Sequence, residues 1–479
     1  MSGRLIVVSN LVGIPNRQEG AQADGLVFAM RTVLTRHSGI WFGWSGTVAP
    51  GKLGAARPYR HAGVSYAIID LTSEDRDEYY NGFANRVLRP VLNYRIDLAE
   101  YSRRDLTGYM RVNDHFALEL HKLIQPNDII WVHDYHLLPL ARMLRERGHH
   151  NRIGFFLHAP FPPPEILTAL PNHERLVPSM AYYDVIGFQT ENDTDNFARY
   201  LANECRVPMI ARHTFLFFGR QVRLGTFPIS IPTAEFNQLA RRATRSPFVK
   251  RVLESLSGQI MMIGVDPADY TKGLLLRMDA FEHFLNAQTD WRGLIVYLQI
   301  TPKYHTDIAE YADIERMLGT TAGRINATYG EASWTPIRYV NRTYNRTDLA
   351  GLYRAARVAL VTPLRDGMNL AAKEFVAAQD AEDPGVLILS RFAGAAAELT
   401  GALLVNPHDP EAVSAAIERA LIMTVEERRQ RHAVLWRVIS GNDVNVWSER
   451  FLTELAEQPL AIERVKNAVG RSSIELSLQ

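Results

Sequence analysis

The chain has 479 residues, against ~100–200 residues for a typical domain, so at least two domains are expected. Its 53 Lys and Arg residues nearly balance its 52 Asp and Glu residues, which excludes a general electrostatic attraction to nucleic acid or to an anionic membrane. With 47% hydrophobic and 22% charged residues, the composition excludes a chain that is mainly disordered.

The cysteine content and the lengths of the apolar runs indicate in which cellular compartment the protein is expected. The single cysteine, Cys205, can form neither an internal disulfide nor a paired-cysteine zinc site, which fits a reducing environment. The apolar run near the N-terminus is too short for the core of a signal peptide, and no run reaches the ~18 residues of a membrane helix. We therefore expect a soluble, cytoplasmic protein.

Short β-branched runs recur along the chain and are separated by segments long enough for helices. The runs are nearly continuous in apolar residues, as in strands that a parallel sheet buries on both faces. In chain order they span residues 4–9, 129–132, 153–157, 260–265, 294–300, 358–361 and 386–389. Amphipathic helices are predicted over 137–147, 192–203, 235–245, 274–284, 410–421 and 444–457. The alternation predicts an α/β fold with right-handed crossovers.

A stretch with two prolines, residues 227–233, predicts a hinge between two α/β lobes of similar size. The N-terminal lobe is expected over residues 1–230 and the C-terminal lobe over 231–440. A helix over 441–457 has room to cross back to the first lobe, and the polar tail, 458–479, is expected to be loose. Because parallel sheets bind ligands at the carboxyl ends of their strands, two lobes facing a cleft would bring both sets of strand ends to one site.

Polar side chains follow two predicted strands of the N-terminal lobe. In the sequence WVHDYH, residues 131–136, Asp134 either orients a substrate hydroxyl or caps the next helix. His133 and His136 lack the further ligands that a metal site needs, so no metal is expected. His158 follows a second buried strand, where it is either a ligand-contacting group or a satisfied structural histidine.

Two motifs follow strands of the C-terminal lobe. Lys272 lies just before a helix, where an ammonium and free amides suit a phosphate, although a solvated turn is the alternative. Further along, Asp366 and Gly367 form a tight turn, so the amides of Met368, Asn369 and Leu370 are expected to open the next helix and face an anion. Two turns later, the carboxylate of Glu374 suits the two hydroxyls of a ribose, and a plain capped helix is the alternative.

These four motifs, in this order and across nearly the whole chain, resemble the trehalose-6-phosphate synthase family. Other matching stretches span residues 41–46, 77–81, 187–192 and 389–394. The resemblance implies a retaining hexosyltransferase of the GT-B fold, with two Rossmann-like lobes facing a cleft. Family enzymes transfer glucose from a nucleotide sugar, usually UDP-glucose, to glucose 6-phosphate, and trehalose biosynthesis is the implied role. UDP-glucose or GDP-glucose is the expected donor, and a sugar, sugar phosphate or cyclitol is the expected acceptor. The resemblance implies no cofactor. It also implies a homo-oligomer, because family members often form one.

The resemblance also implies a role for individual residues. The transferred sugar is expected to contact Asp134, His158 and Asp366. The donor is expected to contact Gly25, Lys272, Tyr344, Gly367, Met368, Asn369, Leu370 and Glu374. Of these, Lys272 and the backbone amides are expected to bind the phosphates. Glu374 is expected to bind the ribose, and Tyr344 is expected near the base. The acceptor side is expected to comprise Trp41, Tyr80, Arg89 and His305.

Five positions depart from the family pattern. Where the family has arginines at the phosphates, this chain has Leu11, Pro267 and His305. Asp24 replaces a glycine near the donor phosphate, and Arg89 replaces a tryptophan of the acceptor pocket. Losing planar guanidinium forks weakens phosphate binding. The sequence therefore leaves three readings open: the usual acceptor, a different and unphosphorylated acceptor, or a catalytically impaired regulatory or ligand-binding homologue.

Overall fold

The chain divides into two compact units. The computed structural model describes residues 3–13, 25–51, 53–217, 219–302 and 309–458. The first unit comprises Met1–Val12, Leu34–Phe227 and Ser448–Gln479, and the second comprises Gly13–Val33 and Pro228–Trp447. The chain thus divides after Phe227, close to the predicted hinge, and the lobe boundaries predicted at 230 and 440 stay predictions. Each unit contains one sheet that is mainly or wholly parallel, which confirms the predicted α/β fold.

Within the described residues, the sheet of the first unit has ten strands in the order β3-β4-β2-β1-β5-β6-β7-β10-β9-β8. The pairs β3–β4, β9–β10 and β8–β9 are antiparallel, and the other six are parallel. The strands are β1 (Leu5–Leu11), β2 (Ile40–Val48), β3 (Arg57–His61), β4 (Val64–Leu71), β5 (Ile129–His133), β6 (Arg152–Phe156), β7 (Val185–Phe188), β8 (Met209–Ala211), β9 (Thr214–Phe217) and β10 (Arg220–Thr226).

The strand order of the first sheet reverses between β1 and β5, since the chain continues from β1 to β2 on one side and from β5 to β6 on the other. Such a switch point is where parallel sheets bind ligands. The register places Ser9 beside His133 and His133 beside Phe156, so the polar residues that follow these strands emerge together.

The first unit also contains helices. They include α2 (Ser73–Asp75), α3 (Arg89–Leu92), α4 (Arg103–Leu123), α5 (Leu140–Glu146), α6 (Pro164–Leu167), α7 (His173–Leu176) and α8 (Glu191–Asn203), and a π-helix over Arg76–Leu88 precedes α3. Two helices contribute residues to both units: α1 (Gly25–His37) and α17 (Val444–Glu457).

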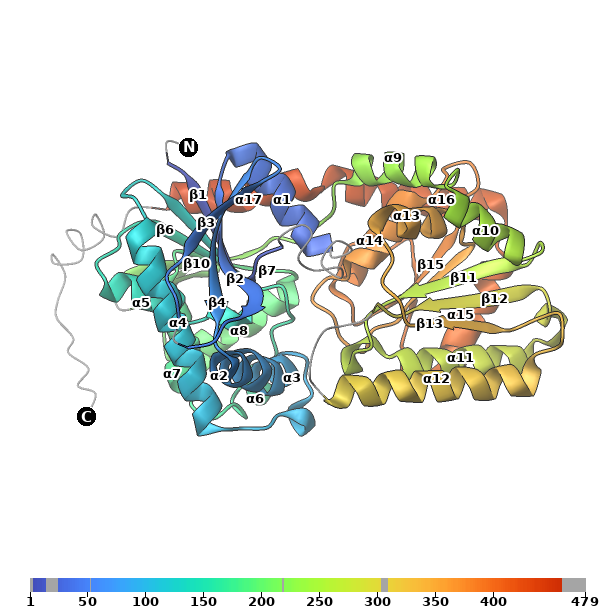
Figure 1. The fold of residues 1–479 in the computed structure, drawn as a ribbon, viewed down its shortest axis with the longest axis horizontal. Helices are drawn as coiled ribbons and strands as arrows, with labels where there is room; N and C mark the ends of the chain where they lie inside the picture. The colour runs from blue at the N-terminus through green and yellow to red at the C-terminus, as the bar shows by residue number, and fades with distance from the viewer. Residues whose placement is uncertain (1–2, 14–24, 52, 218, 303–308, 459–479) are drawn as a thin grey trace. The chain divides into compact units, whose positions relative to one another are not determined.

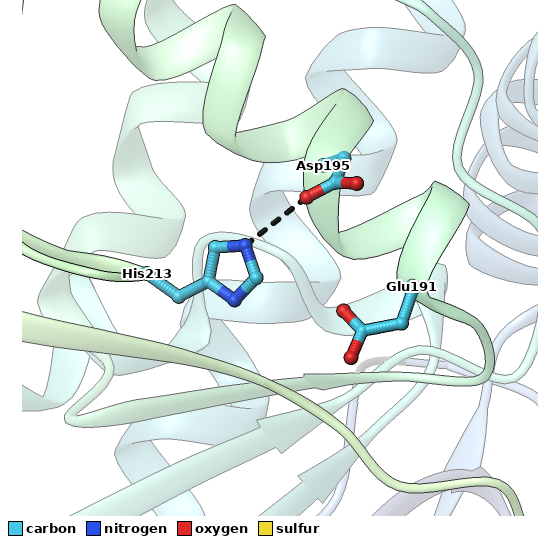
Figure 2. Close-up of side chains that lie close together, drawn as sticks. All are labelled: Glu191, Asp195 and His213. Atoms are coloured by element: carbon cyan, nitrogen blue, oxygen red, sulfur yellow. Dashed lines mark hydrogen bonds and ion pairs between the residues drawn. The ribbon is translucent and has the colours of Figure 1, made fainter.

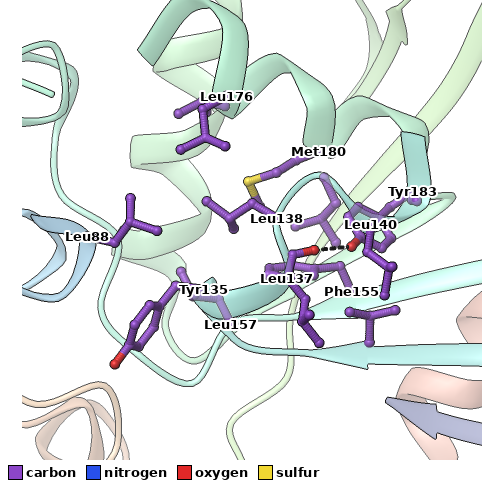
Figure 3. Packing of buried hydrophobic residues seen from close by; sticks show 14 of the residues in the cluster. Leu88, Tyr135, Leu137, Leu138, Leu140, Phe155, Leu157, Leu176, Met180 and Tyr183 are labelled. Atoms are coloured by element: carbon purple, nitrogen blue, oxygen red, sulfur yellow. Dashed lines mark hydrogen bonds between the residues drawn. The ribbon is translucent and has the colours of Figure 1, made fainter. Parts of the chain in front are cut away.

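The helix predicted over 137–147 is shorter in the structure, because α5 begins only at Leu140. Pro139 precedes it and offers no N–H to an earlier turn. Beneath the loop that follows β5 lies an apolar cluster that includes Leu88, Leu138 and Met180 (Figure 3). In this cluster the Tyr183 hydroxyl donates a hydrogen bond to the Leu137 carbonyl at 2.7 Å. The loop therefore rests on a packed, hydrogen-bonded base.

In the described part of the second unit, the sheet is fully parallel and has six strands in the order β13-β12-β11-β14-β15-β16. Its strands are β11 (Ile260–Val265), β12 (Ile295–Ile300), β13 (Ile337–Val340), β14 (Val358–Val361), β15 (Val386–Ser390) and β16 (Leu403–Val405). Its helices are α9 (Thr233–Ala243), α10 (Pro247–Ser255), α11 (Leu274–Ala287), α12 (Ala309–Tyr329), α13 (Arg346–Ala355), α14 (Leu370–Ala378), α15 (Pro410–Ile422) and α16 (Val425–Gly441). Figure 1 shows the sheet between α11, α12 and α15 on one face and α9, α13, α14 and α16 on the other.

This second sheet has its own switch point, between β11 and β14. The loops that follow these two strands are joined directly, because the Leu364 N–H donates to the Thr271 carbonyl at 2.7 Å. The predicted phosphate and sugar motifs, at Lys272 and Asp366, thus lie on neighbouring loops.

None of the helices in the described part of the chain is long and apolar enough to cross a membrane. The predicted location in the cytoplasm stays a prediction.

Candidate active site

Asp134 lies just after β5 in a strained backbone conformation. Its φ of 74° falls in the left-handed region, which non-glycine residues seldom adopt and which is concentrated at functional sites. The side chain does not cap the short helix Tyr135–Leu137 that follows; instead, Oδ1 accepts the backbone N–H of His158 at 3.3 Å. The helix-capping alternative is therefore wrong.

Burial raises the pKa of Asp134 to about 6, although backbone N–H groups and the charge of Arg89 oppose the rise. This carboxyl group therefore ionises within about one pH unit of neutrality. A pKa in that range is typical of residues in active sites.

His158 is paired with His133. His133 Nδ1 and His158 Nε2 lie 3.0 Å apart, and the rings stack with centroids 5.3 Å apart. Burial lowers the pKa of His158 to about 3 and holds the pKa of His133 well below its usual range. Both rings are therefore neutral at pH 7, and one of the two facing nitrogens carries the shared proton. Sequence reasoning gave His133 no role, although its place one residue before Asp134 was the available signal.

Tyr80 and Arg89 belong to the same surroundings. Tyr80 stacks on His136 at 5.8 Å, and His136 also stacks on Tyr135 at 4.2 Å. Burial, aided by the positive charge of Arg89, lowers the pKa of His136 to about 3. The same charge acts on Tyr80 and Asp134. The structure thus gathers two predicted acceptor-side residues around a predicted sugar-contacting residue.

Trp41 lies in β2 and is buried, with 1% of its surface exposed. Its indole N–H donates to the Ser9 hydroxyl at 2.8 Å, and that hydroxyl donates to the Leu11 carbonyl at 2.8 Å. Trp41 therefore supports the end of β1, where Leu11 stands in place of the expected arginine. Direct contact of Trp41 with an acceptor stays a prediction.

In the second unit, Lys272 and Asp366 form an ion pair. Lys272 Nζ lies 2.5 Å from Asp366 Oδ2, and each side chain is 17% exposed. Burial alone would lower the pKa of Lys272, but the carboxylates of Asp366, Asp266 and Asp269 outweigh it and raise the pKa. Lys272 therefore carries a fixed positive charge in a largely buried place, which rules out the alternative of a solvated turn.

Arg277 binds residues next to this ion pair, and its role was not predicted from the sequence. Its guanidinium is buried and donates to Asp266 Oδ2 at 2.7 Å, to Thr362 Oγ1 at 2.8 Å and to Gln299 Oε1 at 3.2 Å. A fourth bond, at 3.4 Å, reaches the carbonyl of Lys272. The available signal was an arginine inside an otherwise apolar stretch of α11.

The loop before α14 differs from the prediction. Asn369 has a φ of 79°, so it is the N-cap rather than a helical residue, and its Oδ1 accepts the N–H of Ala372 at 3.1 Å. The helix begins at Leu370, and the expectation that the Met368 and Asn369 amides open it is wrong. The N–H groups of Leu370 and Ala371 lie in the first turn, outside the helix's own ladder. They can therefore face an anion, and contact of the Met368 and Asn369 amides with the donor stays a prediction.

Gly367 and Asp366 are held by the stretch that follows β15. The Asp366 N–H donates to the Phe392 carbonyl at 3.2 Å, and the Gly394 N–H donates to the Asp366 carbonyl at 3.0 Å. A Cβ atom on Gly394 would lie 1.8 Å from the Gly367 carbonyl oxygen, so only glycine fits there. This contact explains why the motif at 389–394 accompanies the Asp366 motif.

Glu374 is a buried residue of α14, and its carboxylate faces Arg346 of α13, with Oε1 and Nη2 3.1 Å apart. Tyr344, the residue predicted near a base, packs against Phe248 at 5.2 Å. Gly25 is the first residue of α1. His305 and Asp24 lie outside the described residues.

Within the described ranges, one group of side chains has ligand atoms close enough to hold a metal ion. Glu191, Asp195 and His213 have ligand atoms within 4.8 Å of one another, and His213 Nε2 lies 3.0 Å from Asp195 Oδ1 (Figure 2). Both carboxylates are exposed, and the group contains none of the predicted site residues.

Comparison with known proteins identifies the family. Residues 10–457 match Glycosyltransferase family 20. A trehalose-6-phosphate synthase from Sinorhizobium fredii is 47% identical over 454 residues, which cover 94% of this chain and 98% of that protein. A UDP-forming α,α-trehalose-phosphate synthase from Burkholderia xenovorans, solved with glucose 6-phosphate, is 43% identical with a TM-score of 0.91, covering 95% of this chain and 100% of the other. An Escherichia coli structure bound with UDP-2-fluoro glucose is 43% identical with a TM-score of 0.90, covering 96% of this chain and 100% of the other.

The motifs at both switch points and the match over nearly the whole length agree. This chain belongs to glycosyltransferase family 20, the family of the trehalose-6-phosphate synthases, and is a retaining glycosyltransferase.

Proposed function

We propose that this protein transfers glucose from UDP-glucose to glucose 6-phosphate and releases trehalose 6-phosphate and UDP. Two similar proteins support the choice of substrates, one solved with glucose 6-phosphate and one with a UDP-glucose analogue. The observation that carries the proposal is the fixed charge of Lys272, held beside Asp366 at the switch point of the second sheet.

The second unit is proposed to bind the donor. The diphosphate would lie against Lys272 Nζ and the first-turn amides of α14, which together supply one full positive charge and the partial charge of a helix start. The sugar hydroxyls would contact Asp366, whose Oδ2 also accepts from Asn369 Nδ2 at 3.0 Å. The buried Glu374 would accept hydrogen bonds from the ribose hydroxyls.

The first unit is proposed to act on the sugar being transferred. In a front-side retaining reaction, the bond from the anomeric carbon to the diphosphate oxygen breaks, and a bond to the acceptor hydroxyl oxygen forms on the same face. The hydroxyl proton passes to the departing phosphate oxygen. Asp134, mostly ionised above about pH 6, would stabilise positive charge at the anomeric carbon, and the neutral His158 would hold a sugar hydroxyl.

A second candidate is the same transfer to an unphosphorylated acceptor. The observation that favours it is Leu11 at the end of β1, where an apolar side chain replaces an arginine expected at the acceptor phosphate. A third candidate, a ligand-binding homologue without useful catalysis, rests on Leu11, Pro267 and His305 together.

One assay distinguishes these candidates. UDP release is measured with UDP-glucose or GDP-glucose against glucose 6-phosphate, glucose and a panel of cyclitols, and the product is identified by mass. Trehalose 6-phosphate formed from UDP-glucose supports the main proposal. Turnover only with an unphosphorylated acceptor replaces it with the second candidate. UDP binding by calorimetry without turnover on any pair establishes the third.

A further inference from the structure

Arg346 is a buried cation to which the proposed reaction assigns no role. Its side chain is 12% exposed, and its Nη1 and Nη2 atoms are buried without a hydrogen-bond partner among the residues that the structure describes. Nη2 nevertheless lies 3.1 Å from Glu374 Oε1, and the Glu374 side chain is 11% exposed. A guanidinium at this distance holds the carboxylate by charge, while its donors stay available for further bonds.

Two aromatic rings enclose this guanidinium. Its central carbon lies 4.0 Å from the centroid of Phe28 and 4.9 Å from that of Phe236. Cation–π contacts of this kind become stronger when water is excluded. Phe236 comes from α9, whereas Phe28 comes from α1, in the segment Gly13–Val33 that belongs to the second unit. The ion pair is therefore covered by a part of the chain more than 300 residues away in sequence.

The place of Arg346 in its helix argues against a role in helix stability. It is the first residue of α13, where the helix dipole disfavours a cation. The cap of that helix is supplied by Asn345, whose side chain accepts the N–H of Asp348 at 2.8 Å. A buried arginine at this position therefore acts on something other than α13, and the charge it faces is Glu374.

We propose that Arg346 is a positioning residue that orients the Glu374 carboxylate for the donor ribose, with Phe28 covering the pair. The inference rests on the proposed function in one respect, namely that Glu374 contacts the ribose. It adds that discrimination between ribose and 2′-deoxyribose depends on a residue that does not touch the sugar. It also assigns α1 a role in nucleotide binding, because Phe28 lies three residues after Gly25.

The test compares UDP with 2′-deoxy-UDP by calorimetry, and UDP-glucose with its 2′-deoxyribose analogue by kinetics. The wild-type protein is expected to prefer the ribose form by about tenfold or more, as expected for a hydrogen bond to a charged group. Arg346→Met is expected to reduce that preference to about threefold or less, with KM for the donor raised and kcat changed little. Glu374→Gln is expected to lose the same preference, and the double variant to lose no more than either single variant.

Controls separate positioning from folding. Arg241→Met changes an exposed arginine on α9, the helix that carries Phe236, and is expected to keep the full preference. Arg346→Lys keeps the charge but not the planar fork, so its preference for ribose is expected to lie between those of the wild type and of Arg346→Met. It replaces Arg346→Met in the test if that variant does not fold. Phe28→Leu is expected to weaken the preference while the protein stays folded.

Two results would overturn the inference: an Arg346→Met or Arg346→Lys variant that keeps the wild-type preference for ribose, or an equal loss of affinity for both nucleotides. Because the binding arm uses UDP and 2′-deoxy-UDP, which carry no sugar to transfer, it remains decisive even if the wild-type protein transfers no glucose. Failure of the proposed function and failure of this inference are therefore distinguishable.

Discussion

Lys272 Nζ and Asp366 Oδ2 lie 2.5 Å apart on loops that follow neighbouring strands of one parallel sheet. The pair joins a residue proposed to bind the donor diphosphate with one proposed to bind the transferred sugar. If the donor binds as proposed, its diphosphate would compete with Asp366 for the ammonium, so donor binding and the release of Asp366 would be coupled.

Replacing Lys272 by Met should slow transfer by ~10²–10³-fold, because the developing charge on the leaving phosphate loses a preorganised cation. The measurement is kcat from UDP release at saturating donor. Lys250→Met, at an exposed lysine of α10, is the matched control and should leave kcat unchanged. Equal kcat for Lys272→Met and wild type would remove Lys272 from the site.

Asp134→Asn should stabilise the protein at pH 7.5 while abolishing useful transfer. The folded-state pKa of Asp134, about 6, lies above the ordinary value of 3.8, so the folded protein binds this proton more readily than the unfolded chain. Stability contributed by this group is present below about pH 4 and is lost as the pH rises through 6. Removing the charge should therefore raise the free energy of unfolding by ~1–3 kcal/mol at pH 7.5.

The comparison at low pH tests the sign of that effect. Near pH 4 the advantage of Asp134→Asn over wild type in urea unfolding should shrink toward zero. An advantage that grows as the pH falls would show that Asp134 is stabilised in its ionised form.

The buried histidines should have the opposite effect on how stability depends on pH. The pKa values of His133, His136 and His158 are lowered, so their contribution to stability is present above about pH 6.5 and is lost as the pH falls. His136→Phe keeps a ring between Tyr80 and Tyr135 but cannot titrate. Between pH 6.5 and 5 its loss of stability should be smaller than that of wild type by ~2 kcal/mol. Parallel stability curves for the two proteins would contradict this account.

Arg277→Met should destabilise the protein by ~3–5 kcal/mol, because it leaves the buried Asp266 without its charged partner. Urea unfolding gives the value, and Arg316→Met, at an exposed arginine of α12, should lie within ~0.5 kcal/mol of wild type. If Arg277→Met proves as stable as Arg316→Met, the buried network does not support the Lys272 loop as described.

Introducing arginine at two departures should improve the use of a phosphorylated acceptor. In the double variant Leu11→Arg with Pro267→Arg, kcat/KM for glucose 6-phosphate should rise by about tenfold, as for one or two regained charge-assisted bonds. Unphosphorylated glucose serves as the control acceptor, since of the two changes only Pro267→Arg, which restores the arginine expected at the donor phosphates, can affect it. No gain with either acceptor would show that other residues already supply these charges.

Much of the fold was predictable, because the strands that build both switch points are apolar and short. Those at 129–132, 260–265 and 358–361 all fall within strands of the structure. Strands such as Arg57–His61 were missed, since an edge strand exposed to water carries no apolar run. The start of α14 was misplaced because the backbone at Asn369 is left-handed, which the local sequence does not reveal.

The places of the motif residues in the fold were predictable from the sequence, whereas their pairings were not. Asp134, His158, Lys272 and Asp366 each follow a strand, so strand ends pointed to them. Their partners come from distant parts of the chain, as Asp366 does for Lys272, which lies 94 residues earlier, and only the folded structure brings such residues together.

A crystal structure with UDP shows whether the donor diphosphate docks on Lys272 and the start of α14. We expect a phosphate oxygen ~2.7–3.0 Å from Lys272 Nζ, with further contacts from the Leu370 and Ala371 amides. A diphosphate bound elsewhere, with Lys272 still paired to Asp366 alone, would contradict this expectation.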